Sequence, residues 1–308
     1  MYKVFIDGSA GTTGLKIFDR LSNRSDITLI TLDDSLRKDV FARKEAINSS
    51  DVCFLCLPDD AAKESVSLVE NDNVIIIDTS TAHRTNDSFA YGFPELKGYR
   101  EKIQNSHFIA NPGCHASGFI SLIEPLVSAG AIKKDAKLSC YSLTGYSGGG
   151  KKMIAEYENQ NKPTAFESPR LYGLTQSHKH LPEIKKVCNL DYSPVFMPIV
   201  CDYACGMQVS VPLFTSDLKC SVNEVKNIYK ELYNTKVVYY TEDNENGFLA
   251  SNTLSGYDDM QISVFGNEER ITLVSRFDNL GKGASGAAVQ NMNVALGLDE
   301  TFGLNLSK

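Results

Sequence analysis

Residues 2–21, YKVFIDGSAGTTGLKIFDRL, decide the fold that we expect for this chain. A short apolar strand leads into a turn that contains Gly8, Gly11 and Gly14, and apolar residues then recur at helical spacing. The glycine spacing is G-x-x-G-x-x-G, whereas dinucleotide-binding turns usually read G-x-G-x-x-G. Glycines allow close approach to a pyrophosphate, and a helix start offers N–H groups to an anion. The stretch therefore predicts either a nucleotide-binding turn or a plain glycine-rich turn.

The segments that follow repeat this alternation of strand and helix. Apolar and β-branched runs at residues 27–32, 50–58 and 73–80 are typical of further strands, with helical patterns between them. Strands that alternate with helices form a parallel sheet with helices on both faces. We therefore predict an α/β fold of the doubly wound class for this part of the chain.

The pattern changes near Cys114. An apolar-periodic helix is predicted to start at this residue, and longer β-branched runs follow it at residues 137–143, 207–214, 237–240, 260–266 and 271–277. Several of these runs are close enough in sequence to pair as antiparallel neighbours. We expect a second, α+β domain here, followed by a helix rich in glycine and alanine at residues 281–298.

Composition narrows the class of protein. The chain has 308 residues, which suggests two domains, and a net charge of −7, which disfavours a nucleic-acid partner. No apolar run approaches membrane-spanning length, and the first strand starts without a leader, so we expect a cytoplasmic protein. Its eight cysteines are scattered and should be reduced thiols. Neither close cysteine pair has zinc-site spacing, and we predict no metal site.

The charged residues after the second strand bear on the choice of nucleotide. An acidic residue at this position favours the ribose hydroxyls of NAD, whereas an arginine can receive the 2′-phosphate of NADP. Asp33 and Asp34 precede Arg37 and Lys38, so both kinds are present. These residues alone leave the choice between NAD and NADP open. A solvated charged loop with no nucleotide would have the same sequence.

Cys114 in ANPGCHASG (residues 110–118) is the candidate nucleophile. A helix N-terminus stabilises a thiolate, although an inert buried thiol is the alternative. His178 and His180 would point to one side of an extended segment, and one of them could transfer a proton to or from a group on the cysteine. Two metal ligands or two surface histidines are the alternative interpretations of this spacing. His115 is expected to diverge from the thiol.

Two further stretches could hold an anion. Arg84 follows the carboxyl end of a strand in STAHR (80–84), and its guanidinium could fork onto a phosphate or carboxylate. GYSGGGKK (145–152) is a glycine-rich loop that leads into a helix and could form a backbone nest. Each could equally be a plain loop.

Taken together, these motifs resemble the N-acetyl-γ-glutamyl-phosphate reductase family, in particular its shorter form, within the larger group that includes aspartate-semialdehyde dehydrogenase. The matching stretches span nearly the whole chain in order. They are GSAGTTG, CLPDDAA, IDTSTAHR, YGFPEL, NPGCHASG, GYSGGGKKMIAEYE, HKHLPEI and NLGKGASGAAVQNMN. One departure is His115, where many relatives carry an aromatic residue, and we expect it to have little effect on the chemistry.

The resemblance implies a Rossmann domain at residues 1–113 and 280–308, with a catalytic and dimerisation domain inserted at 114–279. It implies Cys114 as nucleophile and His180 as acid/base. The implied substrate contacts are Arg84, His178, Ser147 and Gly148. The implied NADP contacts are Gly8, Ala10, Gly11, Thr12, Thr13, Gly14, Arg37, Lys38, Cys56, Pro58, Ser80, Asn279, Lys282 and Gly283.

The activity that this resemblance implies is reduction of N-acetyl-γ-glutamyl phosphate to the semialdehyde and phosphate with NADPH, through a cysteine thioester, as a step of arginine biosynthesis. The expected small-molecule partner is this acyl phosphate. We also expect a homo-oligomer, and neither a nucleic-acid partner nor a membrane partner. An aspartate-semialdehyde dehydrogenase or a reductase of a carrier-linked amino-acid phosphate shares the chemistry. A non-catalytic NADP-binding redox sensor with a reactive cysteine is the alternative from a different class.

Overall fold

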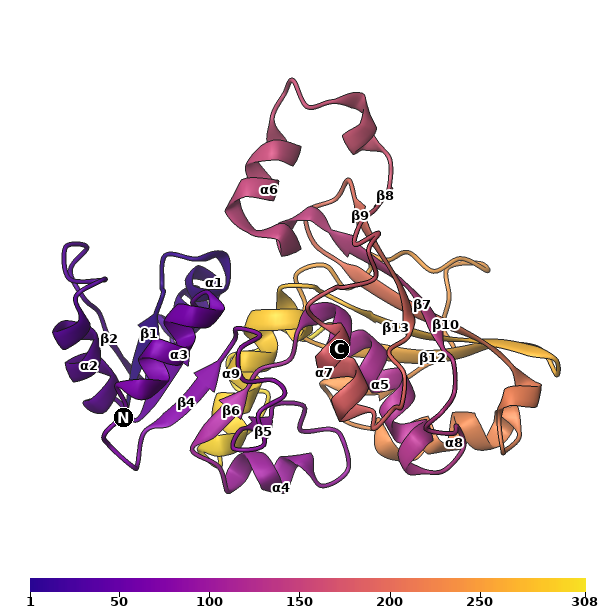
Figure 1. Ribbon diagram of the computed structural model, residues 1–308, viewed down its shortest axis with the longest axis horizontal. Helices are drawn as coiled ribbons and strands as arrows, with labels where there is room; N and C mark the ends of the chain where they lie inside the picture. Colours follow the sequence, from indigo (N-terminus) through magenta and orange to yellow (C-terminus); the bar gives the residue numbers. More distant parts are fainter. The chain divides into compact units, whose positions relative to one another are not determined.

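The strand that opens the chain is the second strand of a six-stranded sheet (Figure 1). All its neighbouring strands pair in parallel, in the order β2-β1-β3-β4-β6-β5. The strands are β1 Tyr2–Asp7, β2 Ile27–Ile30, β3 Val52–Leu55, β4 Ile75–Asp78, β5 Ala90–Tyr91 and β6 Phe108–Ala110. Strands β1 to β4 lie within the runs that the sequence predicted.

Helices cover both faces of this sheet because alternate strand residues are apolar on both sides. They are α1 Thr12–Leu21, α2 Val40–Asn48, α3 Asp59–Ser67, α4 Tyr99–Gln104 and α9 Gly286–Ala295. Val4 and Phe54 share one apolar cluster with residues of α1 and α9, whereas Phe5 and Leu55 share another with residues of α2. The predicted doubly wound α/β class is confirmed.

The computed structural model describes residues 1–308, which fall into two units. The first consists of Met1–Pro94, Gly98–Pro112 and Ala284–Leu304, and it contains the parallel sheet. The second consists of Glu95–Lys97, Gly113–Gly283 and Asn305–Lys308. The helix α9 near the end of the chain, yellow in Figure 1, contacts α1, α4 and β4, so the first unit is completed by a distant segment.

The second unit is built on a mixed seven-stranded sheet in the order β11-β12-β13-β10-β7-β9-β8. Its strands are β7 Ser139–Gly145, β8 Arg170–Leu171, β9 Val195–Cys201, β10 Met207–Phe214, β11 Val238–Tyr240, β12 Met260–Gly266 and β13 Arg270–Phe277. The predicted antiparallel neighbours are present, since β13 pairs with both β10 and β12 in this way. The expected α+β second domain is confirmed.

The long helix α5, Cys114–Ser128, packs on this sheet against β10 and β13. The other helices of the unit are α6 Gly150–Glu158, α7 Leu181–Val187 and α8 Val222–Leu232. Gly118 allows α5 to lie close to the strands, because a Cβ built on it would be 2.3 Å from Val209 Cγ2. Tyr233, which follows the last residue of α8, donates a hydrogen bond of 2.7 Å from its hydroxyl to the carbonyl of Ser121. None of the helices combines the length and the apolar character that spanning a bilayer would need.

Candidate active site

Cys114 is the first residue of α5, as the sequence predicted. From Asn111 to Leu126 it is the one residue that is not buried. The residue before it, Gly113, caps the helix in an extended conformation, and its N–H donates a hydrogen bond of 2.9 Å to Glu183 Oε1. Glu183 is 1% exposed and belongs to the first turn of α7. The thiol therefore stands at the one open position in the first three turns of a buried helix whose start is held by a second helix.

Three histidines gather beside this helix start. The ring centroid of His115 lies 5.5 Å from that of His178 and 5.7 Å from that of His180, and the latter two lie 4.8 Å apart. The prediction of an extended 178–180 segment is wrong, because the N–H of Leu181 donates to the carbonyl of His178 and closes a turn. The turn still brings both rings together, and the N–H of His180 donates to Nδ1 of His178 at 3.2 Å.

Burial decides the charge of two of these rings. Desolvation, with smaller effects from neighbouring charges, lowers the pKa of His115 to about 3 and the pKa of His178 to about 4. Both rings are therefore neutral near pH 7. A neutral imidazole has one donor and one acceptor nitrogen, so each ring has a fixed direction of hydrogen bonding set by its partners.

A hydrogen-bonded chain of three side chains runs through His115. Its Nδ1 lies 2.6 Å from Ser142 Oγ of β7, and its Nε2 lies 2.7 Å from the hydroxyl of Tyr172, which follows β8. The expectation that His115 diverges from the thiol stays a prediction, and its ring lies among the histidines of the 178–180 turn. Sequence reasoning missed Tyr172 and Ser142, which lie in no motif, whereas Glu183 stood inside the quoted HKHLPEI.

The glycine-rich loop at residues 145–152 forms a short 3-10 turn, Tyr146–Gly149, that leads into α6. Ser147 Oγ accepts a hydrogen bond of 2.9 Å from Asn279 Nδ2, and Asn279 Oδ1 accepts one of 2.9 Å from the N–H of Gly206. A Cβ on Gly148 would be 3.3 Å from Asn279 Nδ2. The structure thus brings together three predicted site residues from motifs more than a hundred positions apart. Their predicted contacts with substrate and cofactor stay predictions.

Lys282 and Gly283 lie in the turn Gly281–Ser285. Lys282 is 1% exposed, and its Nζ donates to both carboxylate oxygens of Glu95, at 2.7 and 2.9 Å. A buried ion pair of this kind fixes a local geometry, because either charge alone would be strongly destabilising. Gly283 lies against the nucleophile, since a Cβ built on it would be 3.0 Å from Cys114 Cβ. The cofactor role predicted for both residues stays a prediction.

In the first unit, the three glycines shape the turn between β1 and α1. Gly8 has a φ of +89°, and a Cβ on it would be 2.4 Å from the carbonyl oxygen of Cys56. Gly11 donates its N–H to the carbonyl of Gly8 at 3.0 Å, and a Cβ on Gly14 would be 2.5 Å from that same oxygen. No side chain caps the first turn of α1. Its amides, which include those of Thr12 and Thr13, are therefore suited to a pyrophosphate, with the exposed Ala10 beside them.

The charged residues after β2 lie on the surface of the first unit. Arg37 Nη2 forms an ion pair of 2.7 Å with Asp34 Oδ1, and both side chains are exposed. An exposed pair of this kind contributes little free energy, so a 2′-phosphate could replace the carboxylate. Lys38 is exposed at the next position. Both cations are thus accessible on the surface of their unit.

The carboxyl ends of β3 and β4 carry the remaining predicted residues. Burial raises the pKa of the Cys56 thiol to about 12, Pro58 caps α3, and Ser80 donates its hydroxyl to Asp78 Oδ2 at 2.8 Å. Arg84 is 8% exposed. Its Nε donates to the carbonyl of Asn111, and its Nη2 to that of Thr79, both at 2.9 Å. Arg84 therefore braces backbone in this unit, and its contact with a substrate anion stays a prediction.

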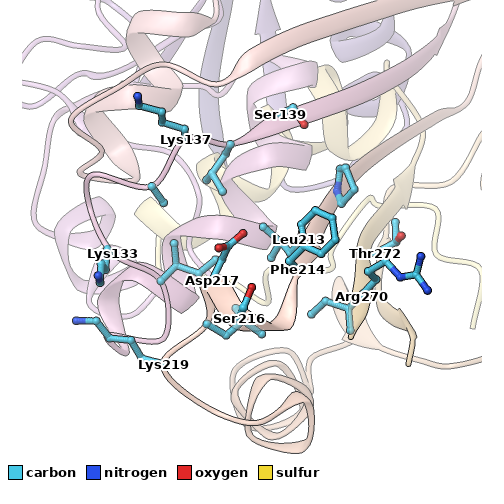
Figure 2. A pocket seen from close by; sticks show the side chains of 16 residues that line it. Lys133, Lys137, Ser139, Leu213, Phe214, Ser216, Asp217, Lys219, Arg270 and Thr272 are labelled. Atoms are coloured by element: carbon cyan, nitrogen blue, oxygen red, sulfur yellow. The ribbon is translucent and has the colours of Figure 1, made fainter. Parts of the chain in front are cut away.

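A cavity of about 960 Å³ lies elsewhere in the second unit (Figure 2). It is lined by Ser139, the first residue of β7, and by Phe214, the last residue of β10. Lys219, at its rim, donates its N–H to the carbonyl of Ala131, just beyond the C-terminal end of α5. A helix of 15 residues is roughly 20 Å long, so this cavity is about a helix length from Cys114.

The chain is similar to known proteins over nearly its whole length. Residues 3–106 match the semialdehyde dehydrogenase NAD binding domain, and residues 114–279 match the semialdehyde dehydrogenase dimerisation domain. It is 43% identical to N-acetyl-gamma-glutamyl-phosphate reductase 2 of Nostoc sp., with 98% of this chain and 99% of that protein covered. It is 45% identical to N-acetyl-gamma-glutamyl-phosphate reductase of Brucella ovis, with 96% and 99% covered.

Solved structures with a similar fold are more distant in sequence. Aspartate semialdehyde dehydrogenase II from Vibrio cholerae superposes with a TM-score of 0.71 at 16% identity, covering 96% of this chain and 98% of that one. Aspartate semialdehyde dehydrogenase from Francisella tularensis superposes with a TM-score of 0.70 at 14% identity, covering 96% and 99%. At these identities the likeness concerns the fold alone.

Proposed function

Because the chain belongs to the N-acetyl-γ-glutamyl-phosphate reductase family, we propose that it reduces N-acetyl-γ-glutamyl phosphate to N-acetyl-glutamate semialdehyde and phosphate, a step of arginine biosynthesis. The observation that carries the proposal is the placement of Cys114. It is the single open residue of a buried helix start that Glu183 holds in place, near the neutral rings of His115 and His178. This is a suitable place for a nucleophilic thiolate.

The first chemical step belongs to Cys114. Its thiolate sulfur attacks the acyl carbon of the substrate, a sulfur–carbon bond forms, and the bond from that carbon to the phosphate oxygen breaks with its electron pair leaving on phosphate. The product on the enzyme is a thioester. The amides at the start of α5 are placed to stabilise negative charge on the acyl oxygen during attack.

The second step reduces this thioester. The first unit matches a nicotinamide-binding domain, and a cofactor held there would supply the hydride that the acyl carbon needs. His180 protonates the oxyanion of the resulting thiohemiacetal. It takes the proton back as the carbon–sulfur bond breaks, its electron pair leaves on sulfur, and the aldehyde and the Cys114 thiolate are released. The low pKa of His178, about 4, disfavours any state in which His178 carries a positive charge, and this supports His180 as the acid/base.

NADPH is the proposed form of the cofactor. The glycine turn and the uncapped start of α1 suit the pyrophosphate of either nucleotide. The exposed Arg37 and Lys38 support the 2′-phosphate, because Arg37 is held only by a surface ion pair with Asp34. Replacing Arg37 and Lys38 by alanine should raise the KM for NADPH at least about tenfold, as expected from the loss of charge-assisted contacts, and leave that for NADH unchanged. Equal changes in the KM for NADPH and for NADH would contradict a role of these cations in binding the 2′-phosphate.

We also propose a homo-oligomer in the cytoplasm. The sheet face of the second unit opposite α5 exposes Tyr141, Val195 and Phe214, by 46%, 56% and 60%. Exposed apolar side chains that share one sheet face support contact with another copy of the chain. All eight cysteines are free, which supports a reducing compartment. Sedimentation equilibrium of the purified protein tests the first point, and a monomer at micromolar concentration would contradict it.

The substrate is tested in the reverse direction. The protein is incubated with NADP⁺, phosphate and either N-acetyl-glutamate semialdehyde or aspartate semialdehyde, and NADPH is followed by its absorbance. We expect turnover with the acetylated substrate and at least about a hundredfold lower kcat/KM with the other, a discrimination that polar contacts can supply. Preference for aspartate semialdehyde would identify the rival dehydrogenase activity instead.

Covalent catalysis is tested with a pair of cysteine variants. Cys114→Ser should lower kcat by roughly three orders of magnitude or more, because a hydroxyl is a far weaker nucleophile than a thiolate. Cys220→Ser is the matched control, since Cys220 is also partly exposed and lies just before α8. A Cys114→Ser enzyme with most of its wild-type rate would rule out the thioester route.

A further inference from the structure

Ser142, His115 and Tyr172 are joined by two hydrogen bonds. Their burial determines which group donates and which accepts in each bond. Ser142 is 0% and His115 3% exposed, and the two lie 2.6 Å apart between Oγ and Nδ1. His115 Nε2 lies 2.7 Å from the hydroxyl oxygen of Tyr172, which is only partly buried. All three residues belong to the second unit. The mechanism above uses none of them.

The proton positions follow from counting donors and acceptors. The hydroxyl of Ser142 has one hydrogen-bond partner, Nδ1 of His115, and a fully buried hydroxyl without an acceptor is costly. Ser142 therefore donates to Nδ1. The neutral ring then carries its proton on Nε2 and donates it to the oxygen of Tyr172. The O–H of Tyr172 is left without an acceptor among the residues of the protein.

The reverse direction is less favourable. If Nδ1 donated to Ser142, the buried serine proton would have no acceptor, and Tyr172 would donate to Nε2. That arrangement leaves the unsatisfied donor at a fully buried site, where water cannot reach it. The first arrangement leaves it on a partly exposed tyrosine, where water or a bound substrate can accept the proton.

We propose that Tyr172 donates a hydrogen bond to the acyl oxygen of the substrate on Cys114, and that His115 and Ser142 are positioning residues that orient its O–H. The proposal rests on the function proposed above, because it needs an acyl group at Cys114. Tyr172 keeps its proton throughout, and His180 remains the residue that transfers one. The hydrogen bond strengthens as negative charge develops on the acyl oxygen.

The surroundings of Tyr172 support this role. Cys114 directly precedes His115 in the chain, and the ring of His178 lies 6.0 Å from that of Tyr172. Burial, and secondarily the negative charge of Cys114, raises the pKa of Tyr172. The hydroxyl is thus near enough to respond to charge at the nucleophile, and its raised pKa keeps it protonated as a donor near pH 7.

The donor and acceptor roles in these two hydrogen bonds are tested first, without substrate. Nitrogen-15 NMR of histidine-labelled protein at pH 7, with His115→Phe to assign the signals, reports which nitrogen of His115 carries the proton. We expect a protonated Nε2 and an unprotonated Nδ1. A proton on Nδ1 would overturn the proposal, because Tyr172 would then donate to His115. This readout does not depend on which substrate the enzyme uses.

The role of the donor is tested by kinetics. Tyr172→Phe should lower kcat about a hundredfold and change KM less than about threefold, as expected for a contact made in the transition state. Tyr192→Phe, at an exposed tyrosine, is the matched control. A KM that rises while kcat is retained, or a retained rate, would overturn the proposal. If the wild-type enzyme does not turn over the acetylated substrate, the proposed function fails instead, and the NMR result still stands.

A double-mutant cycle separates positioning from general support of the fold. His115→Phe should lower kcat about tenfold in the wild-type background and have little further effect in the Tyr172→Phe background. Additive losses would show that His115 acts through another route and would overturn its positioning role. Ser142→Ala provides the second route to the same conclusion, since it removes the donor to Nδ1 while leaving both rings in place.

Discussion

Lowering the pH should destabilise this protein through His115. The ring is 3% exposed and hydrogen-bonded at both nitrogens, and burial is the main cause that lowers its pKa from 6.5 to about 3. The unfolded chain has the ordinary pKa of about 6.5, so below that pH the unfolded state binds a proton that the folded state excludes. The stabilisation is therefore complete above about pH 6.5 and is lost as the pH falls toward 3.

The size of the effect follows from these two pKa values. Each pH unit below 6.5 is worth about 1.4 kcal/mol, so His115 should lower the free energy of unfolding by about 2 kcal/mol between pH 7 and pH 5. His178 shifts in the same direction, with its pKa at about 4. Its ring is more open to solvent, so its share is smaller.

The assay is urea unfolding followed by far-ultraviolet circular dichroism at pH 7 and pH 5, at one protein concentration and ionic strength. His115→Phe keeps a ring but cannot be protonated, so its loss between the two pH values should be about 2 kcal/mol smaller than that of the wild type. In the His115→Phe variant the hydroxyl of Ser142 has lost its hydrogen-bond partner. The comparison is therefore repeated in a Ser142→Ala background, where this hydroxyl is absent. Equal losses in wild type and variant would refute the reasoning from burial.

Three further predictions concern the support of the site. Iodoacetamide at pH 7.5 should label Cys114 faster than the six cysteines whose thiol pKa burial raises; equal rates would contradict an activated thiolate. Glu183→Ala should lower the free energy of unfolding by about 1–3 kcal/mol, and Glu183→Gln by less, because only the amide still accepts from the Gly113 N–H. Gly118→Ala should cost about 1–3 kcal/mol in the same measurement, since its methyl group would overlap Val209.

Local patterns were sufficient for the strand–turn–helix units and for the start of α5. Both depend on near neighbours in sequence: apolar periodicity gives the element, and Gly113 before Cys114 marks the end of one and the start of the next. Strand β9 was not among the predicted strands, and Pro198 interrupts its otherwise apolar run and removes one backbone N–H from the ladder. The strand tolerates it because one neighbour, β8, is only two residues long.

The hydrogen-bonded side chains of the site could not be predicted from such patterns. Tyr172 and Ser142 lie 57 and 27 positions from His115, and nothing in their own segments marks them. Their meeting depends on the pairing of β8 with β9 and of β9 with β7. Arg84 is a second example of a contact that local patterns do not predict. An arginine after a strand suggests an anion site, but in the fold its Nε also donates to the carbonyl of Asn111.

The packing of α5 explains why a helix with few polar residues can carry the chemistry. Its carbonyls at Gly118 and Ser121 accept hydrogen bonds from Ser275 and Tyr233, so partners from β13 and from the end of α8 fix the helix along its length. A helix held in this way has little freedom at its start, and the amides there keep their orientation toward an acyl oxygen. Tyr172 adds a donor from outside the helix to that same oxygen. Rigid burial of α5 and the opening at its first residue, Cys114, are therefore two parts of one arrangement.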